Sequence, residues 1–141
     1  QAIGADMSKD ANITAFLDGS NYAVVGASTD RSKYGNMVLR TYLQKNMSVI
    51  PVNPRATEVE GIAAVDSLSD IKETVHGISV ITPPAITERV VEEAIQQNIG
   101  HIWMQPGAES DAAVAAAEAA GINVIHSGPC LLVVLGFRDA H

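Results

Sequence analysis

The chain has 141 residues and a formal net charge of −7, and hydrophobic residues make up 47% of it. These values are typical of one globular domain with a well-filled core, and the acidic balance argues against general binding to nucleic acids. The single cysteine excludes an intramolecular disulfide and a cysteine-based zinc site, and no apolar run approaches the roughly 20 residues of a membrane span.

The start of the chain has no hydrophobic periodicity. Residues 1–6 precede Met7, so we expect them to be an extraneous or disordered leader, and we expect residues 7–141 to form a single domain. No signal peptide is visible, which favours a cytoplasmic protein. A short lead-in helix is predicted over 12–17.

Five short apolar runs are predicted to be strands, and helical patterns lie between them. The predicted strands are 22–25, 48–52, 77–81, 101–104 and 122–125. The predicted helices are 34–43, 67–75, 84–98 and 111–120. This alternation predicts an α/β protein, a three-layer Rossmann-like fold with a five-stranded, mainly parallel sheet and helices on both faces.

The sequence also predicts how the strands are arranged. Numbered along the chain, we expect the strands in the order 3-2-1-4-5. Pro51 lies inside the second strand, where it cannot donate a ladder hydrogen bond. The last apolar run, 131–135, fits either a sixth strand or a buried terminal segment.

Each predicted strand ends in a cluster of Gly, Pro and small polar residues. In a parallel sheet these clusters share one edge, which is where open α/β sheets bind ligands. After the first strand, Gly26 would allow a phosphate to approach the backbone, and the following helix would point its N–H groups at it. Gly35 lies nine residues later, so the spacing is not G-x-G-x-x-G, and an ordinary tight turn remains an alternative.

The second strand ends without the acidic residue that usually holds the ribose of NAD. Arg55 stands there instead, and no carboxylate follows until Glu58. An arginine at this place suits a ribose that carries a phosphate, as in NADP and coenzyme A. The alternative is a solvated surface arginine.

A more specific resemblance rests on segments 24–28, 33–35, 49–54, Gly61, 81–84 and 102–107. In order and spacing they resemble the small stand-alone CoA-binding protein family, which is related in fold to the N-terminal domain of the succinyl-CoA synthetase α subunit. The resemblance implies a Rossmann-like fold that binds coenzyme A or an acyl-CoA. It places the pyrophosphate over Gly26 to Ser28 and the helix start at Tyr34-Gly35, and the adenosine 3′-phosphate near Asn53 to Arg55.

The full set of cofactor-binding residues implied by the resemblance is Gly26, Ala27, Ser28, Arg31, Lys33, Tyr34, Gly35, Asn53, Pro54, Arg55, Thr82, Pro83, Pro84, Met104, Gln105 and Cys130. The chain departs from the family at its end. Many bacterial members have Asp-Arg-Cys-Pro after the fifth strand, whereas Ser127 to Cys130 here lacks the basic residue.

No catalytic constellation or set of metal ligands is visible in the sequence. Cys130 is a candidate nucleophile, but the apolar run that follows it favours a buried, inert thiol. We therefore expect a domain that binds a small-molecule CoA ligand without catalysis, with no nucleic-acid or membrane partner. The sequence is also compatible with a homodimer or with another protein partner. Two alternatives stay open, an NADP-binding reductase or sensor domain and a protein-interaction domain with a vestigial crevice.

Overall fold

The computed structural model describes residues 2–139, with side chains described from residue 10 onward. The helices are α1 (Ala2–Leu17), α2 (Tyr34–Gln44), α3 (Pro84–Gln96), α4 (Asp111–Ala119) and α5 (Leu131–Leu135). The strands are β1 (Asn21–Val25), β2 (Ser48–Val52), β3 (Glu58–Val59), β4 (Ile62–Ala63), β5 (Gly77–Val80), β6 (His101–Met104) and β7 (Asn123–Ile125), and η1 (Leu68–Asp70) is a 3-10 turn.

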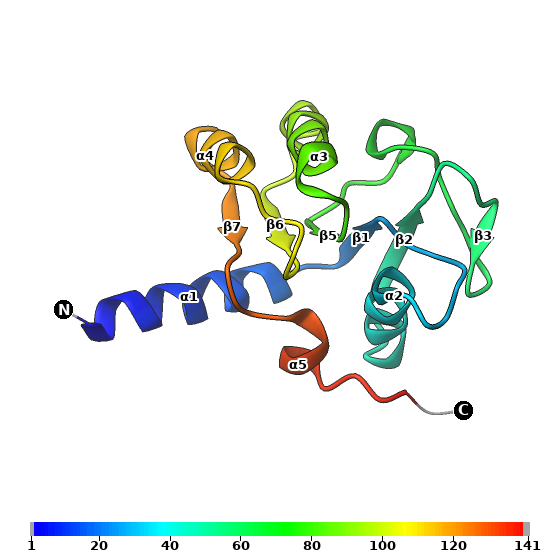
Figure 1. Ribbon diagram of the computed structural model, residues 1–141, viewed down its shortest axis with the longest axis horizontal. Coiled ribbons are helices and arrows are strands. Elements are labelled where there is room, and N and C mark those ends of the chain that lie inside the picture. The colour runs from blue at the N-terminus through cyan, green and yellow to red at the C-terminus, as the bar shows by residue number, and fades with distance from the viewer. Residues whose placement is uncertain (1, 140–141) are drawn as a thin grey trace.

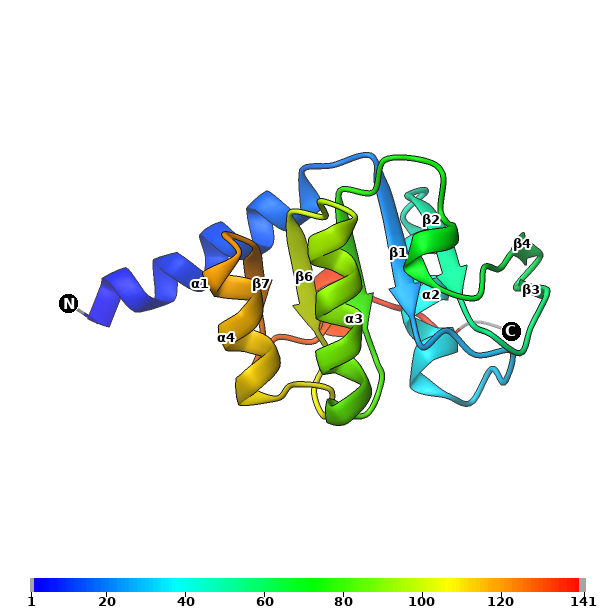
Figure 2. The same ribbon diagram turned by 90° about the horizontal axis from the view of Figure 1, so that it is seen from above.

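Five parallel strands form one sheet in the order β2-β1-β5-β6-β7. Helices α3 and α4 cover one face of this sheet, and α1, α2 and α5 lie on the other (Figures 1 and 2). The predicted fold class, a three-layer Rossmann-like α/β sheet, is confirmed. In the described part of the chain, no helix is long and apolar enough to cross a membrane.

The alternation of side chains along β1 divides the core into two layers. Ala23 and Val25 pack toward α3 and α4, whereas Tyr22 and Val24 pack toward α1 and α2. All four are at most 6% exposed. A central strand that is buried on both faces needs a continuous apolar run, which explains why this short segment contains no charged residue.

The predicted strand order 3-2-1-4-5 is wrong, because the third large strand, β5, pairs with the free side of β1 rather than with β2. The outer side of β2 is instead occupied by an isolated bridge to Val65. Val65 donates its N–H to the carbonyl of Pro51, and Asn53 donates its N–H to the carbonyl of Val65. With that side taken, the chain must cross back over β1 before it can extend the sheet.

The position of β2 at the sheet edge also explains Pro51. An edge strand has one side without a ladder partner, so the missing N–H of proline can face that side. Pro51 is paired in register with Val24 of β1 and still accepts a hydrogen bond from Val65.

The segments at the two ends of the chain differ from expectation. Helix α1 begins at Ala2, so the predicted helix over 12–17 was too short, and residues 2–6 are helical rather than irregular. That region contains no proline, and alanine favours continued helix. The segment 131–135 forms helix α5 rather than a strand, and it is buried on one side only, since Leu131 is 0% exposed and Val133 is 79% exposed.

The connection between β2 and β5 contains structure that the sequence did not reveal. A two-stranded hairpin, β3–β4, turns at Glu60 and Gly61, both of which have positive φ angles. The predicted helix over 67–75 is limited to η1. Its start was correctly located, because the Asp70 carboxylate accepts a hydrogen bond from the backbone N–H of Ser67.

Helix α1 packs at the amino ends of the strands. His76 Nε2 lies 2.9 Å from the carbonyl oxygen of Ala15, and the Asn123 side chain donates to the carbonyl of Asn12. This edge is opposite to the one at which the Gly- and Pro-rich clusters gather. The amino edge is therefore filled by the helix.

Helix α2 begins in contact with the end of β1. A Cβ atom at position 35 would collide with the carbonyl oxygen of Gly26, a backbone atom that cannot move aside. We expect Gly35→Ala to lower the free energy of unfolding by about 3 kcal/mol, although alanine normally favours a helix. Urea denaturation would measure this change.

Gly100→Ala is the matched control, because a Cβ at position 100 meets no atom within 4 Å. It should change stability by less than about 0.5 kcal/mol. Equal stability of the two variants would show that α2 can move away from β1.

Candidate ligand-binding cleft

A cleft of about 910 Å³ opens where β1 and β2 end, between α3 and the segment that leads into η1. The predicted site residues that line it are Gly26, Ala27, Ser28, Lys33, Asn53, Pro54, Arg55, Thr82 and Pro83. It is also lined by Val25, Val52, Asp66, Ser67, Ile86, Arg89, Val90 and Glu93, which were not predicted. The Gly- and Pro-rich clusters after the first three predicted strands therefore meet in one cavity.

The topology explains the position of this cleft. From β1 the chain moves outward to β2 and then returns to the other side of β1, so the strand order reverses beside β1. Ligands of open α/β sheets bind at such a reversal. Here the returning segment covers the sheet face only with the short η1 rather than a full helix, which leaves the apolar surface of Val25 and Val52 as the floor of the cleft.

The turn after β1 has the geometry of an anion site. Gly26 has a φ of +97°, which favours glycine, and a Cβ there would lie 3.3 Å from the carbonyl carbon of Ile81. Helix α2 follows, and its N-cap residue, Lys33, makes no side-chain capping hydrogen bond. The first N–H groups of such a helix are oriented to bind a negatively charged group.

A second helix starts at the same cleft. The N-cap residue of α3 is Pro83, which makes no side-chain capping bond, and Pro84 occupies the first helical position. The hydroxyl oxygens of Thr82 and the buried Thr87 lie 2.9 Å apart, which fixes the strand-to-helix turn. Two helix N-termini thus border one cavity.

Asn53 joins the turns after β1 and β2. Its side-chain N–H donates to the carbonyl of Ala27 over 2.8 Å, and its Oδ1 accepts a hydrogen bond from the backbone N–H of Arg55 over 2.7 Å. The asparagine therefore sets the distance between the two turns, and its side-chain amide is used by the protein itself. The Arg55 side chain is exposed.

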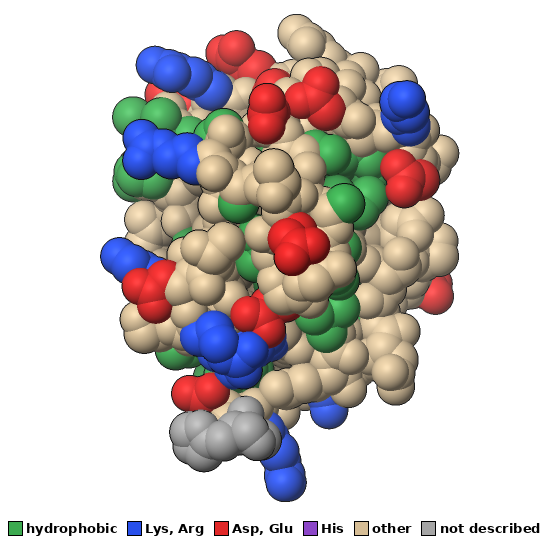
Figure 3. All heavy atoms as spheres, turned by 90° about the vertical axis from the view of Figure 1, so that its right-hand side faces the viewer, with side chains coloured by type: hydrophobic (Ala, Val, Ile, Leu, Met, Phe, Trp, Pro, Cys, Tyr) green, Lys and Arg blue, Asp and Glu red, His purple; other side chains and the backbone are tan. Residues whose placement is uncertain are grey.

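The charges of the cleft contrast with those of the whole chain. Lys33, Arg55 and Arg89 line it together with Asp66 and Glu93, so cations exceed carboxylates on a chain of net charge −7. Among the described residues, the ion pairs are Arg31 with Glu60 and Arg40 with Asp139, which leaves the three cleft cations without a carboxylate within 4.0 Å. Figure 3 shows Lys and Arg side chains on the left of the view, with apolar side chains between them.

The remaining predicted site residues do not line the cleft: Arg31, Tyr34, Gly35, Pro84, Met104, Gln105 and Cys130. The Arg31 guanidinium pairs with Glu60 at 2.6 Å, and Gly35 is required by its contact with Gly26. Met104 and Gln105 are completely buried, so they belong to the core at the end of β6.

Tyr34, Gln105 and Cys130 form a separate cluster on the α5 side of the sheet. The Tyr34 hydroxyl contacts the Cys130 thiol and donates to Gln105 Oε1 over 3.1 Å. The same oxygen accepts the backbone N–H of Leu131 over 2.9 Å, which anchors the start of α5. Cys130 is partly buried, and its thiol contacts Tyr34 rather than lining the cleft.

Arg89 is the main residue that sequence reasoning missed. It lies on the wall of the cleft together with Ile86, Val90 and Glu93 of α3. Their spacing of three and four residues places them on one side of a helix. That signal was present in the sequence, but it does not say whether such a face meets solvent or a ligand.

These features define a Rossmann-like α/β domain, with a cleft lined by several cations at the point where strand order reverses. The sequence profile of the CoA binding domain family matches residues 20–136. The chain belongs to this family, and the resemblance noted from its motifs is confirmed.

Relatives and solved structures agree with this assignment. The chain is 29% identical to protein YneT of Bacillus subtilis over 103 residues, which are 73% of this chain and 76% of YneT. It is 25% identical over 77 residues to the ADP-forming acetate–CoA ligase of Methanocaldococcus jannaschii, covering 55% of this chain but 11% of the ligase. A conserved hypothetical protein of Pyrococcus furiosus has a TM-score of 0.77 and 35% identity, covering 82% of this chain and 99% of that one.

All three tyrosines have raised pKa values. Burial is the main cause at Tyr22, Tyr34 and Tyr42, and the neighbouring Cys130 raises the pKa of Tyr34 further. We expect the folded protein to form little tyrosinate at pH 10, the ordinary pKa, whereas the urea-unfolded chain should be about half ionised there. Ultraviolet absorbance would follow both titrations.

The sign of the effect on stability follows from these directions. Below pH 10 the tyrosines are neutral in both states. As pH rises above 10, the unfolded chain releases protons that the folded chain keeps, so stability should fall. A phenol that titrates at pH 10 or below in the native protein would contradict the burial described above.

Proposed function

We propose that the cleft binds coenzyme A or an acyl-CoA and that the chain carries out no catalysis of its own. The observation that carries this proposal is the set of three unpaired cations and two uncapped helix N-termini around one apolar cavity, in a chain of the CoA binding domain family. Coenzyme A combines three phosphate groups with a flat adenine and an extended pantetheine. The donors and the apolar floor of the cleft suit that combination.

In the proposed arrangement, the pyrophosphate lies against the Gly26 turn and the start of α2. The adenosine lies over the apolar floor, and its 3′-phosphate lies near Arg55, with Arg89 on the opposite wall. Backbone N–H groups and arginines form charge-assisted hydrogen bonds with phosphate, which are stronger than neutral ones.

The proposal of binding without catalysis rests on where the reactive groups lie. Cys130 contacts Tyr34 away from the cleft. The chain matches 11% of the acetate–CoA ligase of Methanocaldococcus jannaschii, so the activity of that whole enzyme is not transferred to it. Incubation with acetyl-CoA followed by chromatography tests this part, and release of free coenzyme A above a buffer control would contradict it.

Isothermal titration calorimetry tests the binding proposal directly. We expect coenzyme A to bind with a micromolar dissociation constant, about −7 to −8 kcal/mol. NAD should bind at least about tenfold more weakly, because it lacks the third phosphate that the cleft cations would contact. Tighter binding of NAD or NADP than of coenzyme A would overturn the assignment and favour a dinucleotide site.

Substitution of the cleft arginines tests the position of the 3′-phosphate. Arg55→Ala should lower the affinity for coenzyme A by about 1.5–3 kcal/mol, the usual range for a hydrogen bond to a charged group. Dephospho-CoA, which lacks the 3′-phosphate, should bind the variant and the wild type almost equally. Arg89→Gln should weaken coenzyme A by about 1 kcal/mol, less than Arg55→Ala, because Arg89 lies on the wall opposite the proposed 3′-phosphate position.

Lys72→Ala is a suitable control, because Lys72 is exposed and does not line the cleft. It should leave both affinities unchanged. If Arg55→Ala weakens coenzyme A and dephospho-CoA by the same factor, Arg55 does not contact the 3′-phosphate.

A further inference from the structure

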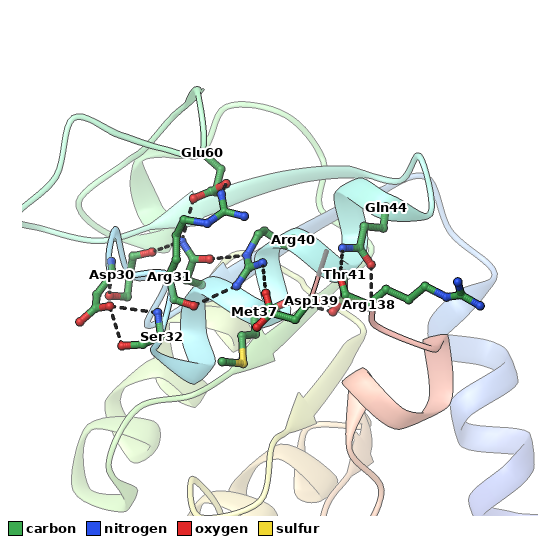
Figure 4. Close-up of polar contacts among 12 residues, drawn as sticks. Asp30, Arg31, Ser32, Met37, Arg40, Thr41, Gln44, Glu60, Arg138 and Asp139 are labelled. Carbon is green, nitrogen blue, oxygen red and sulfur yellow. Dashed lines mark hydrogen bonds and ion pairs between the residues drawn. The ribbon is translucent and has the colours of Figure 1, made fainter. Parts of the chain in front are cut away.

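The loop that joins β1 to α2 is held in place by two buried side chains of α2. Ser28 and Lys33 of this loop line the cleft. The Asn36 side chain donates to the carbonyl of Ser28 over 2.9 Å, and Arg40 Nη2 donates to the carbonyl of Arg31 over 2.9 Å. Both loop carbonyls therefore accept hydrogen bonds from α2, and Figure 4 shows the bond from Arg40 to Arg31.

All three guanidinium nitrogen atoms of Arg40 donate a hydrogen bond. Besides the loop carbonyl, its Nε donates to Asn36 Oδ1 over 2.6 Å, and its Nη1 donates to Asp139 Oδ1 over 2.8 Å. The guanidinium also lies 5.1 Å from the centre of the Phe137 ring. Arg40 is 5% exposed, so its charge is almost fully removed from water.

The segment that supplies the carboxylate is itself docked on α2. Gln44 Nε2 donates to the carbonyl of Arg138 over 2.6 Å, and the Arg138 backbone N–H donates to Gln44 Oε1 over 3.0 Å. These reciprocal bonds place Asp139 beside Arg40. Arg40 therefore connects the segment 138–139 to the loop between β1 and α2, because it bonds to both Asp139 and the Arg31 carbonyl.

A buried guanidinium needs a carboxylate, because a charge without a partner in the protein interior is strongly unfavourable. Without Asp139, Arg40 would gain by turning toward water and would then release the loop carbonyl and Asn36. We propose that Asp139 and Arg40 are positioning residues for ligand binding, which hold the loop 28–33 in its phosphate-binding shape. We name Asn36, Arg40 and Asp139 the carboxyl-terminal clamp.

The effect on affinity rests on the proposed function, but the effect on the loop does not. We therefore test the loop first, by amide hydrogen exchange of the ligand-free protein. The N–H groups of Asp30, Ser32 and Lys33 bond within the loop. They should exchange at least about tenfold faster in Asp139→Asn, because the loop opens more often.

The second measurement is the affinity for coenzyme A and for dephospho-CoA. Both contain the pyrophosphate, so Asp139→Asn should weaken both by the same factor of about ten, or about 1.4 kcal/mol. Direct electrostatics predicts the opposite sign, because the substitution removes a negative charge and should favour an anion. Glu118→Gln removes the same charge from an exposed site on α4 and should not weaken either ligand.

Two further variants separate the clamp from a general loss of stability. Arg40→Lys keeps the charge but not the planar fork, so it should also weaken both ligands. In the double variant, Arg40→Lys should add little to the loss of binding free energy caused by Asp139→Asn. The losses caused by Arg55→Ala and Asp139→Asn should instead be additive. Asp139→Glu should restore most of the affinity. Thermal melts confirm that each variant is folded.

The outcomes are distinguishable. Loop amides that exchange in Asp139→Asn as they do in the wild type would overturn the clamp, whatever the ligand does. Faster exchange in a protein whose wild type does not bind coenzyme A would support the clamp's control of the loop and overturn the proposed function. Faster exchange with unchanged affinity would show that the loop does not bind the pyrophosphate and would overturn the positioning role.

Discussion

The close contact between the start of α2 and the end of β1 is the constraint on which the site depends. Only a hydrogen atom fits at position 35, so the helix begins directly against the backbone of Gly26. This contact places the helix N-terminus beside the turn, where its free N–H groups can meet an anion. It also carries Asn36 and Arg40 to the underside of the loop, and it brings the Tyr34 ring to Gln105 and Cys130. A methyl group at position 35 would push α2 away from β1 and would change all of these contacts together.

The cavity itself results from what the chain lacks on one face of the sheet. Most crossovers of an α/β sheet carry a helix that covers the neighbouring strands. Between β2 and β5 the chain forms a small hairpin and η1 instead. No helix therefore covers Val25 and Val52 at the ends of β1 and β2, and both residues line the cleft. Among the residues whose side chains are described, no carboxylate pairs with the cations around this opening, although the chain as a whole is acidic. The anion binding that we propose is therefore a local property of this face, which composition alone could not reveal.

The sequence predicted elements well where one local pattern dominated. The bounds of β2 and β6 agree with the prediction, and α4 begins at the predicted residue, Asp111. Strand order was not predictable in this way, because it depends on which side of β1 receives β5, a choice between distant segments. Gly26 and Arg55 were predicted from the composition of the strand ends, and both line the cleft. Arg89 was missed and Gln105 misassigned, since helix and strand spacing do not tell whether a polar side chain faces a ligand, water or the core.

The pairing of β1 with β5 has a consequence for how the domain folds. Val25 pairs with Val80, whereas the neighbouring strand β2 follows β1 after one helix. Closing the longer loop costs more chain entropy and slows folding. A nascent chain can therefore complete β1, α2 and β2 with the glycine turn already shaped, while the wall contributed by α3 is still unattached. A cavity with both of its walls therefore forms only when the two halves join, which requires the slower closure between β1 and β5.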